Sequence, residues 1–187
     1  MRHSILKPLI LKLRTPTPRT LKPWLSVLAF AAMLAPAYTA AGVEAYSSNE
    51  GSYSVNFPVA PQETVREVGK DKLIAHVIRD GDVIYVAAHG DFTRAVKPET
   101  EMNANIENYT HEIHAKVTSR AQVTIPRGER ELTGIQFSYD GEFQSGTGIV
   151  VVDGTSSYLV AASYLKPADD QQAVNAFINS FRLKPKQ

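Results

Sequence analysis

Cysteine is absent from the 187-residue sequence, which contains five histidines and a single tryptophan. Without cysteine the chain can form no disulfide bond, carry no lipid on an N-terminal cysteine and use no thiol nucleophile. Its folded part must therefore be stabilised by a hydrophobic core alone, and a domain of about 140 residues buries enough surface for that.

Long apolar runs are also scarce. The longest, "WLSVLAFAAMLA" (24–35), is shorter than the roughly 20 residues that a membrane-spanning helix needs. A basic segment precedes it and the small residues "AYTAAG" follow it, which is the order of a secretory signal. We therefore expect residues 1–41 to be a signal peptide cleaved near Ala41, with the mature protein periplasmic or extracellular and without a membrane span. An uncleaved N-terminal membrane anchor is the alternative.

Acidic residues are missing from the first 42 positions, which hold six of the 20 basic residues. The remaining chain has 14 basic and 19 acidic residues, a formal charge of −5. Proteins that bind nucleic acid need clustered positive charge to neutralise phosphates, so this mildly acidic body argues against a nucleic-acid partner.

The mature chain begins with "GVEAYSSNE", which predicts a flexible lead-in over residues 42–50. Residues 51–58 then alternate, with Tyr53, Val55 and Phe57 on one face, and this period of two predicts a strand. A weaker strand is expected over residues 63–68.

Asp80–Gly81 marks the clearest hairpin, because this dipeptide favours a two-residue turn. If Arg79 pairs with Asp82, one face of the hairpin is wholly apolar and should lie on the core. It consists of Leu73, Ala75, Val77, Ile84, Val86 and Ala88. The other face is mixed, as in a sheet covered only in part, and consists of Lys72, Ile74, His76, Ile78, Val83, Tyr85, Ala87 and His89. His76 should pair across the strands with Tyr85, too far from His89 for the two histidines to share a metal ion.

The period changes to that of a helix over about residues 98–115, with Pro98 at its start. Its apolar stripe consists of Met102, Ile106, Tyr109 and Ile113. Strand character returns over 115–126, and Asp140–Gly141 and Asp153–Gly154 predict two more hairpins. Residues 150–152 and 159–162 should be the most buried part of this meander. A second helix is expected after Pro167, capped by Asp169 and Asp170, with a stripe of Val174, Phe177, Ile178 and Phe181.

These elements predict a single α+β domain over residues 51–184, built on an antiparallel sheet of hairpins. Their order resembles that of PsbP-like domains. The resemblance rests on "GSYSVNFP", the hairpin ending in "VIYVAAHGDF", the strand from Gly134 to Tyr139, "SYLVAASYL" and "NAFINSFRL". It implies an α-β-α sandwich with a central antiparallel sheet, one helix between groups of strands and one at the C-terminus. Members of this family include lumenal subunits that assist the oxygen-evolving side of photosystem II and exported bacterial proteins.

Reactive motifs are hard to find. Ser145 in "FQSGTG" lacks the first glycine of a nucleophile elbow and leads into a strand. Gly146 and Gly148 are followed by no helix that could bind a phosphate, so we expect them to permit close approach within a strand. We accordingly predict that the protein is not an enzyme and assign no catalytic and no cofactor-binding residues.

The segment "HEIH" (111–114) contains the one candidate metal-binding site, on one edge of the predicted helix. On a helix, His111 and His114 lie three residues apart, and Glu107 precedes His111 by one turn. A metal site needs three or four converging ligands, yet these residues lie on the face expected to contact water, so no metal ligand is assigned.

The sequence thus predicts an exported, non-catalytic binding or assembly module whose partner is another envelope protein. The alternative is a small-ligand or metal carrier that uses the mixed face or the edge formed by Glu107, His111 and His114.

Overall fold

The structure is a computed structural model that describes residues 44–68 and 71–185. The signal peptide predicted over residues 1–41 lies outside these residues. The described chain forms ten strands and two helices. They are β1 (Glu44–Ser48), β2 (Tyr53–Phe57), β3 (Gln62–Val68), β4 (Asp71–Asp80), β5 (Val83–Asp91), α1 (Pro98–Glu112), β6 (Ala115–Arg127), β7 (Arg130–Gly141), β8 (Gln144–Asp153), β9 (Ser156–Leu165), α2 (Gln171–Ser180) and β10 (Arg182–Leu183).

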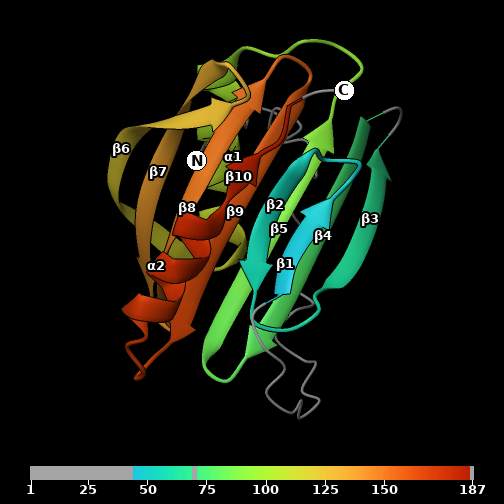
Figure 1. Ribbon diagram of the computed structural model, residues 1–187. Helices are drawn as coiled ribbons and strands as arrows, with labels where there is room; N and C mark the ends of the chain where they lie inside the picture. The colour runs from blue at the N-terminus through green and yellow to red at the C-terminus, as the bar shows by residue number, and fades with distance from the viewer. Residues whose placement is uncertain (1–43, 69–70, 186–187) are drawn as a thin grey trace, which may run out of the picture.

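Seven strands form one antiparallel sheet in the order β3-β4-β5-β9-β8-β7-β6. Helix α1 lies behind this sheet in Figure 1, and α2 lies in front of it together with a small sheet of order β1-β2-β10. The predicted α-β-α sandwich with a central antiparallel sheet is therefore confirmed. Within the described part of the chain, no helix is both long and apolar enough to span a membrane.

Each face of the large sheet carries its own hydrophobic cluster, because successive side chains of a strand point to opposite faces. On the α1 side, Met102, Ile106 and Tyr109 pack against alternate residues of β7, β8 and β9, such as Val150. On the α2 side the intervening residues of these strands pack against the predicted stripe of Val174, Phe177, Ile178 and Phe181, all of which are buried. Residues 150–152 and 159–162 are buried as predicted.

Residues at the ends of the two helices explain where each helix begins or stops. Pro98 occupies the first turn of α1, and Glu99 and Glu101 place negative charge at the positive end of its dipole. The Asp170 carboxylate accepts a hydrogen bond from Ala173 N (3.1 Å) and caps α2. Helix α1 ends at Glu112, three residues before the predicted end, because His114 adopts a left-handed φ of 52°.

The register of the β4–β5 hairpin differs from the predicted one by two residues. Asp80 pairs with Val83, so the turn consists of Gly81 and Asp82 and not of Asp80 and Gly81. Asp153 likewise pairs with Ser156, which places Gly154 at the first turn position. Gly81 and Gly154 have φ values of 57° and 66°, a conformation that glycine adopts without steric cost. In both turns the aspartate is the last residue of the strand.

Two further predictions are wrong. Residues 42–50 are not a flexible lead-in throughout, because Glu44–Ser48 form β1 and pair with β2. The mixed face of the β4–β5 hairpin, predicted to be covered only in part, is the more completely covered of its two faces. It packs against the small sheet and α2, and its buried members are Ile74, His76, Ile78, Val83, Tyr85, Ala87 and His89. On the face predicted to lie on the core, Leu73, Val77 and Ile84 are only half-buried.

Candidate functional site

A buried histidine joins the two sheets. His76 of β4 is 2 % exposed, and its ring lies between two tyrosines of the small sheet. Its Nε2 is 2.5 Å from Tyr46 Oη and 3.0 Å from Glu63 Oε2, and its Nδ1 is 3.0 Å from Tyr53 Oη. Both ring nitrogens are therefore engaged, whichever of them carries the proton. This arrangement holds β1 and β2 against β4 and leaves the ring no free nitrogen for a substrate.

The phenols around His76 remain protonated at neutral pH. Burial raises the pKa of Tyr53 well above its ordinary value, and nearby Tyr46 and Glu63 raise it further. The pKa of Tyr46 is also raised, first by burial and then by the charge of Glu63. Neither tyrosine can therefore serve as a base near neutrality, and both can hold hydrogen bonds with the imidazole.

His89 of β5 is the second buried histidine of this face. Its ring stacks on Tyr158 (6.4 Å between centroids) and meets the edge of Tyr53 (5.9 Å). Burial lowers the pKa of its imidazole, although the charge of Asp91 opposes the shift. Within the described residues, its Nδ1 is buried without a hydrogen-bond partner.

The observed register of β4 and β5 differs from the predicted cross-strand partners of these histidines. His76 pairs with Ala87 and not with Tyr85, while His89 pairs with Ile74. The partner of His76 on β5 is therefore two residues from His89, whereas the predicted partner, Tyr85, is four residues from it. The mixed face is buried beneath the small sheet, so it offers no surface on which the alternative carrier function could take place.

The segment "HEIH" does not form the predicted edge. His111 is the last basic residue of α1, but His114 lies beyond the helix end in the left-handed conformation. Its backbone N–H donates to His111 O (3.1 Å), and both side chains are exposed. The spacing of three residues therefore no longer places them on one helical face with Glu107. Across residues 44–68 and 71–185, no three His, Asp or Glu side chains are grouped so that they could hold a metal ion.

Arg127 was not singled out from the sequence, yet it is 2 % exposed at the end of β6. It donates to Asp153 Oδ2 (2.8 Å), Tyr158 Oη (3.1 Å) and Lys184 O (3.0 Å). A buried arginine ties several segments together only when its donors find acceptors. Through its Nε and Nη1, Arg127 fastens β6, β8, β9 and the C-terminal segment, whereas its Nη2 is buried without a hydrogen-bond partner among the described residues. Most residues of β6 that precede Arg127 are exposed, so the strand pattern did not indicate that Arg127 is buried.

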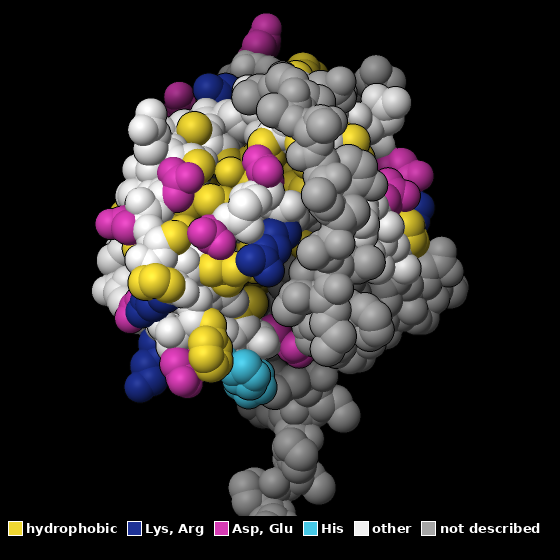
Figure 2. All heavy atoms as spheres, turned by 90° about the horizontal axis from the view of Figure 1, so that it is seen from below, with side chains coloured by type: hydrophobic (Ala, Val, Ile, Leu, Met, Phe, Trp, Pro, Cys, Tyr) yellow, Lys and Arg dark blue, Asp and Glu magenta, His cyan; other side chains and the backbone are white. Residues whose placement is uncertain are grey.

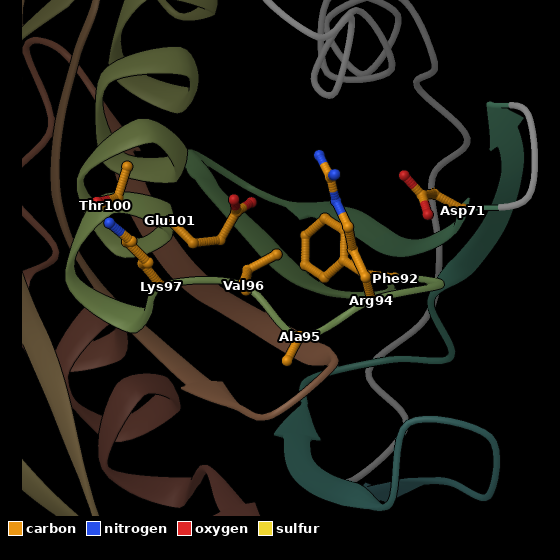
Figure 3. A pocket seen from close by; sticks show the side chains of 8 residues that line it. All are labelled: Asp71, Phe92, Arg94, Ala95, Val96, Lys97, Thr100 and Glu101. Carbon is orange, nitrogen blue, oxygen red and sulfur yellow. The ribbon is translucent and has the colours of Figure 1, made fainter.

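A hollow of about 400 Å³ lies where the loop after β5 enters α1 (Figure 3). Phe92 and Val96 supply its apolar surface, and Phe92 is buried. In Figure 3 the Arg94 side chain projects between the carboxyl groups of Glu101, from α1, and Asp71, from β4. The sequence pattern did not reveal this hollow, because it arises where a loop, a strand and a helix meet.

The end of the molecule with the β4–β5 turn and the start of α2 is seen directly in Figure 2. Acidic and basic side chains there surround a group of hydrophobic ones. The β7–β8 turn lies at the same end, because Lys166 N donates to Phe143 O (2.9 Å) just before α2. Phe143 is 66 % exposed at the tip of this turn. It offers a partner an aromatic side chain that the core does not use.

Solved structures that match this chain support the assignment of its fold. The solution structure of cyanobacterial PsbP (CyanoP) from Synechocystis sp. PCC 6803 matches with a TM-score of 0.52 and 10% identity, covering 80% of this chain and 97% of that chain. A crystal structure from Bacteroides thetaiotaomicron matches with a TM-score of 0.38 and 9% identity, covering 78% of this chain and 49% of that one. No protein-family model and no curated protein matches the sequence. The PsbP-like fold expected from the resemblance is thus confirmed at the level of the fold.

Proposed function

We propose that this protein is an exported, non-catalytic module that binds another protein of the cell envelope. The observation that carries the proposal is the hollow beside α1, where Phe92 and Val96 form an apolar floor and exposed Arg94 and Lys97 lie at the rim. Apolar centres with polar rims are typical of protein interfaces, in which arginine is enriched.

The loop that forms this hollow is held in place before any partner arrives. Phe92 N donates to Thr155 O (2.8 Å) and Val96 N donates to Gly154 O (3.3 Å), so the turn between β8 and β9 supports the loop. Thr93 N also donates to the Asp71 carboxylate (3.0 Å). A surface that is already ordered loses less conformational entropy on binding, which favours its use as a contact.

Two further points support a binding role. The PsbP-like resemblance implies a protein that assists a larger assembly, and the N-terminal sequence has the order of an export signal. His76, which is buried among several polar neighbours, is engaged in joining the two sheets. A residue with that role supports the fold and needs no substrate to explain it.

The proposal is tested by charge reversal at the rim of the hollow. Protein lacking residues 1–41 captures its partner from envelope extracts, and the purified pair is then measured by calorimetry. We expect Arg94→Glu combined with Lys97→Glu to weaken binding by about tenfold or more, because both cations approach the partner. The matched control is Arg79→Glu with Lys116→Glu, which reverses the same types of charge at exposed positions elsewhere.

Equal losses in the two double variants would mean that only the net charge of the protein matters, and would refute the hollow as the contact. Unchanged binding by the Arg94 and Lys97 variant would refute it as well. If extracts from the native host repeatedly yield no partner for the wild-type protein, the binding function itself is wrong.

A further inference from the structure

A second hollow lies on the opposite side of the large sheet from α1. Helix α2 packs mainly on β9, β8 and β5, whereas β6 contacts β10, and α2 lies in front of this side of the sheet in Figure 1. The hollow between this helix and β6 measures about 430 Å³. That volume lies within the range of about 300–1,000 Å³ in which proteins bind small molecules.

The residues around this hollow carry hydroxyl and amide groups where the rest of the same face is apolar. Along β8, Ser145 and Thr147 line the hollow, whereas Ile149 and Val151 on the same face belong to the core. Ser145 and Thr147 are only 7 % and 6 % exposed. Their cross-strand partners on β7 are Asp140 and Ser138, which also line the hollow. Buried polar groups are costly unless they find hydrogen-bond partners.

Three side-chain amides also line the hollow, two on α2 and one on β7. Gln171 and Asn175 lie one turn apart on α2, and Gln171 Nε2 donates to Asn175 Oδ1 (3.1 Å). Gln136 of β7 faces the same space. Each amide combines a donor group with an acceptor oxygen, which matches ligands whose hydroxyl groups also donate and accept.

The charge of the hollow selects against ionic ligands. Asp140 is its one charged lining residue in the part of the chain that the structure describes. This carboxylate accepts hydrogen bonds from Lys166 Nζ (2.7 Å) and from the Ser145 hydroxyl, so its charge is already balanced. An anion would find no unpaired cation here, and a cation such as calcium requires six or more oxygen ligands.

Tyr164 of β9 supplies the aromatic element. Its ring is half-buried beside Ser145 and lines the hollow, so it offers a flat apolar surface next to the polar groups. From these observations we propose that the hollow binds a neutral, polyhydroxylated ligand about the size of a disaccharide or trisaccharide. The polar groups pair with its hydroxyls, and Tyr164 packs on a ring face that carries only C–H groups.

The proposal is tested by nuclear magnetic resonance on the ¹⁵N-labelled protein beginning at residue 42. Neutral trisaccharides serve as probes: cellotriose, maltotriose and the trimer of N-acetylglucosamine, each added to about 10 mM because open sites of this kind bind weakly. We expect at least one of them to shift the amide signals of Gln136, Ser138, Thr147 and Asn175 in a saturable manner. The double variant Gln136→Ala with Asn175→Ala should then weaken binding by about tenfold.

The matched control is Gln122→Ala with Gln172→Ala, which removes two exposed amides that do not line the hollow and should leave binding unchanged. Sorbitol and the trimer of galacturonic acid complete the series. If sorbitol binds as tightly as the trisaccharides, the ligand is an open-chain polyol, which is still a neutral, polyhydroxylated molecule as proposed. Stronger binding of the acidic trimer, or no saturable shift with any neutral probe, would overturn the proposal. Either result leaves the contact proposed beside α1 unaffected.

Discussion

Phe177 brings together α2, the small sheet and the large sheet. It is 2 % exposed, and its ring centroid lies 5.1 Å from that of Phe57 in β2 and 5.0 Å from that of Tyr85 in β5. We expect Phe177→Ala to lower the free energy of unfolding by about 3–5 kcal/mol, because it removes a large buried ring and leaves a cavity. Urea denaturation measures the change.

The control for this prediction is Gln172→Ala, an exposed position on the same helix, which should alter the free energy of unfolding by less than about 0.5 kcal/mol. A loss of less than about 1 kcal/mol in the Phe177 variant would contradict the packing described for α2.

His89 makes a prediction about pH. Because burial lowers the pKa of its imidazole in the folded state, the unfolded chain takes up a proton at this residue first as the pH falls below about 6.5. The contribution of neutral His89 to the free energy of unfolding is thus complete above that pH. It is lost as the pH falls toward the pKa that His89 has in the folded protein. We expect the free energy of unfolding to decrease between pH 7 and 5, by up to about 1.4 kcal/mol per pH unit.

The His89→Phe variant keeps an aromatic ring beside Tyr158 but cannot be protonated. Urea denaturation over this pH range should therefore show a flatter profile for the variant than for the wild type. His111→Asn at an exposed position should keep the wild-type slope. If the slopes of His89→Phe and wild type are the same, another group is responsible for the acid sensitivity.

At the scale of the elements, the end of α1 contains a correctable strain. His114 has a φ of 52°, a left-handed conformation that costs an L-residue about 1–2 kcal/mol and that glycine adopts freely. Glycine loses more entropy on folding, so the two effects partly cancel. We expect His114→Gly to raise the free energy of unfolding by about 0.5–1 kcal/mol in urea denaturation.

His111→Gly is a matched control with the opposite sign. This residue lies inside α1 and is exposed, so glycine should lower the free energy of unfolding by about 1 kcal/mol. A loss of stability in both variants would contradict the left-handed conformation of His114 and would mean that the helix continues through it.

The alternation of apolar residues was enough to predict most strands and both helices. It also identified the buried faces of β2, α1 and α2, because a period of two or of 3.6 residues is visible in the sequence. The hairpin registers were harder. An Asp–Gly pair fits a turn whether aspartate occupies the first turn position or ends the strand, and Asp80 and Asp153 take the second arrangement.

The small sheet and the candidate sites could not be predicted in the same way. Strand β1 has no strong apolar pattern, and β10 has only two residues, so neither signals a second sheet. Polar His76 and His89 made the mixed face resemble a solvated one, although tyrosines from β1 and β2 surround them. The hollow beside α1 joins residues 92–101 to Asp71, and the second hollow joins residues of β6, β7, β8, β9 and α2, which only the tertiary structure brings together.

At the scale of the whole molecule, β2 is the strand on which the two ends of the described chain meet. It pairs with β1 on one side and with β10 on the other. Lys184 N donates to Ser52 O (2.8 Å), and Arg127 donates to Lys184 O (3.0 Å), which connects the C-terminal segment to both sheets. The small sheet is therefore not an appendage but a part of the core shared with α2 and the mixed face of β4 and β5.

This arrangement predicts that loss of the C-terminal segment destabilises the entire fold. Phe181 and Leu183 are 5 % and 6 % exposed and pack in the same cluster as Tyr53. We expect a protein that spans residues 42–180 to melt about 10 °C or more below one that ends at Pro185, because two large buried side chains are removed. Far-ultraviolet and near-ultraviolet circular dichroism should report a single, coincident transition, because the tyrosines that give the near-ultraviolet signal lie in both sheets, Tyr46 and Tyr53 in the small one and Tyr85 and Tyr158 in the large one. A shift of less than about 2 °C, or a near-ultraviolet change at a lower temperature than the far-ultraviolet transition, would contradict the coupling of the small sheet to the rest of the fold.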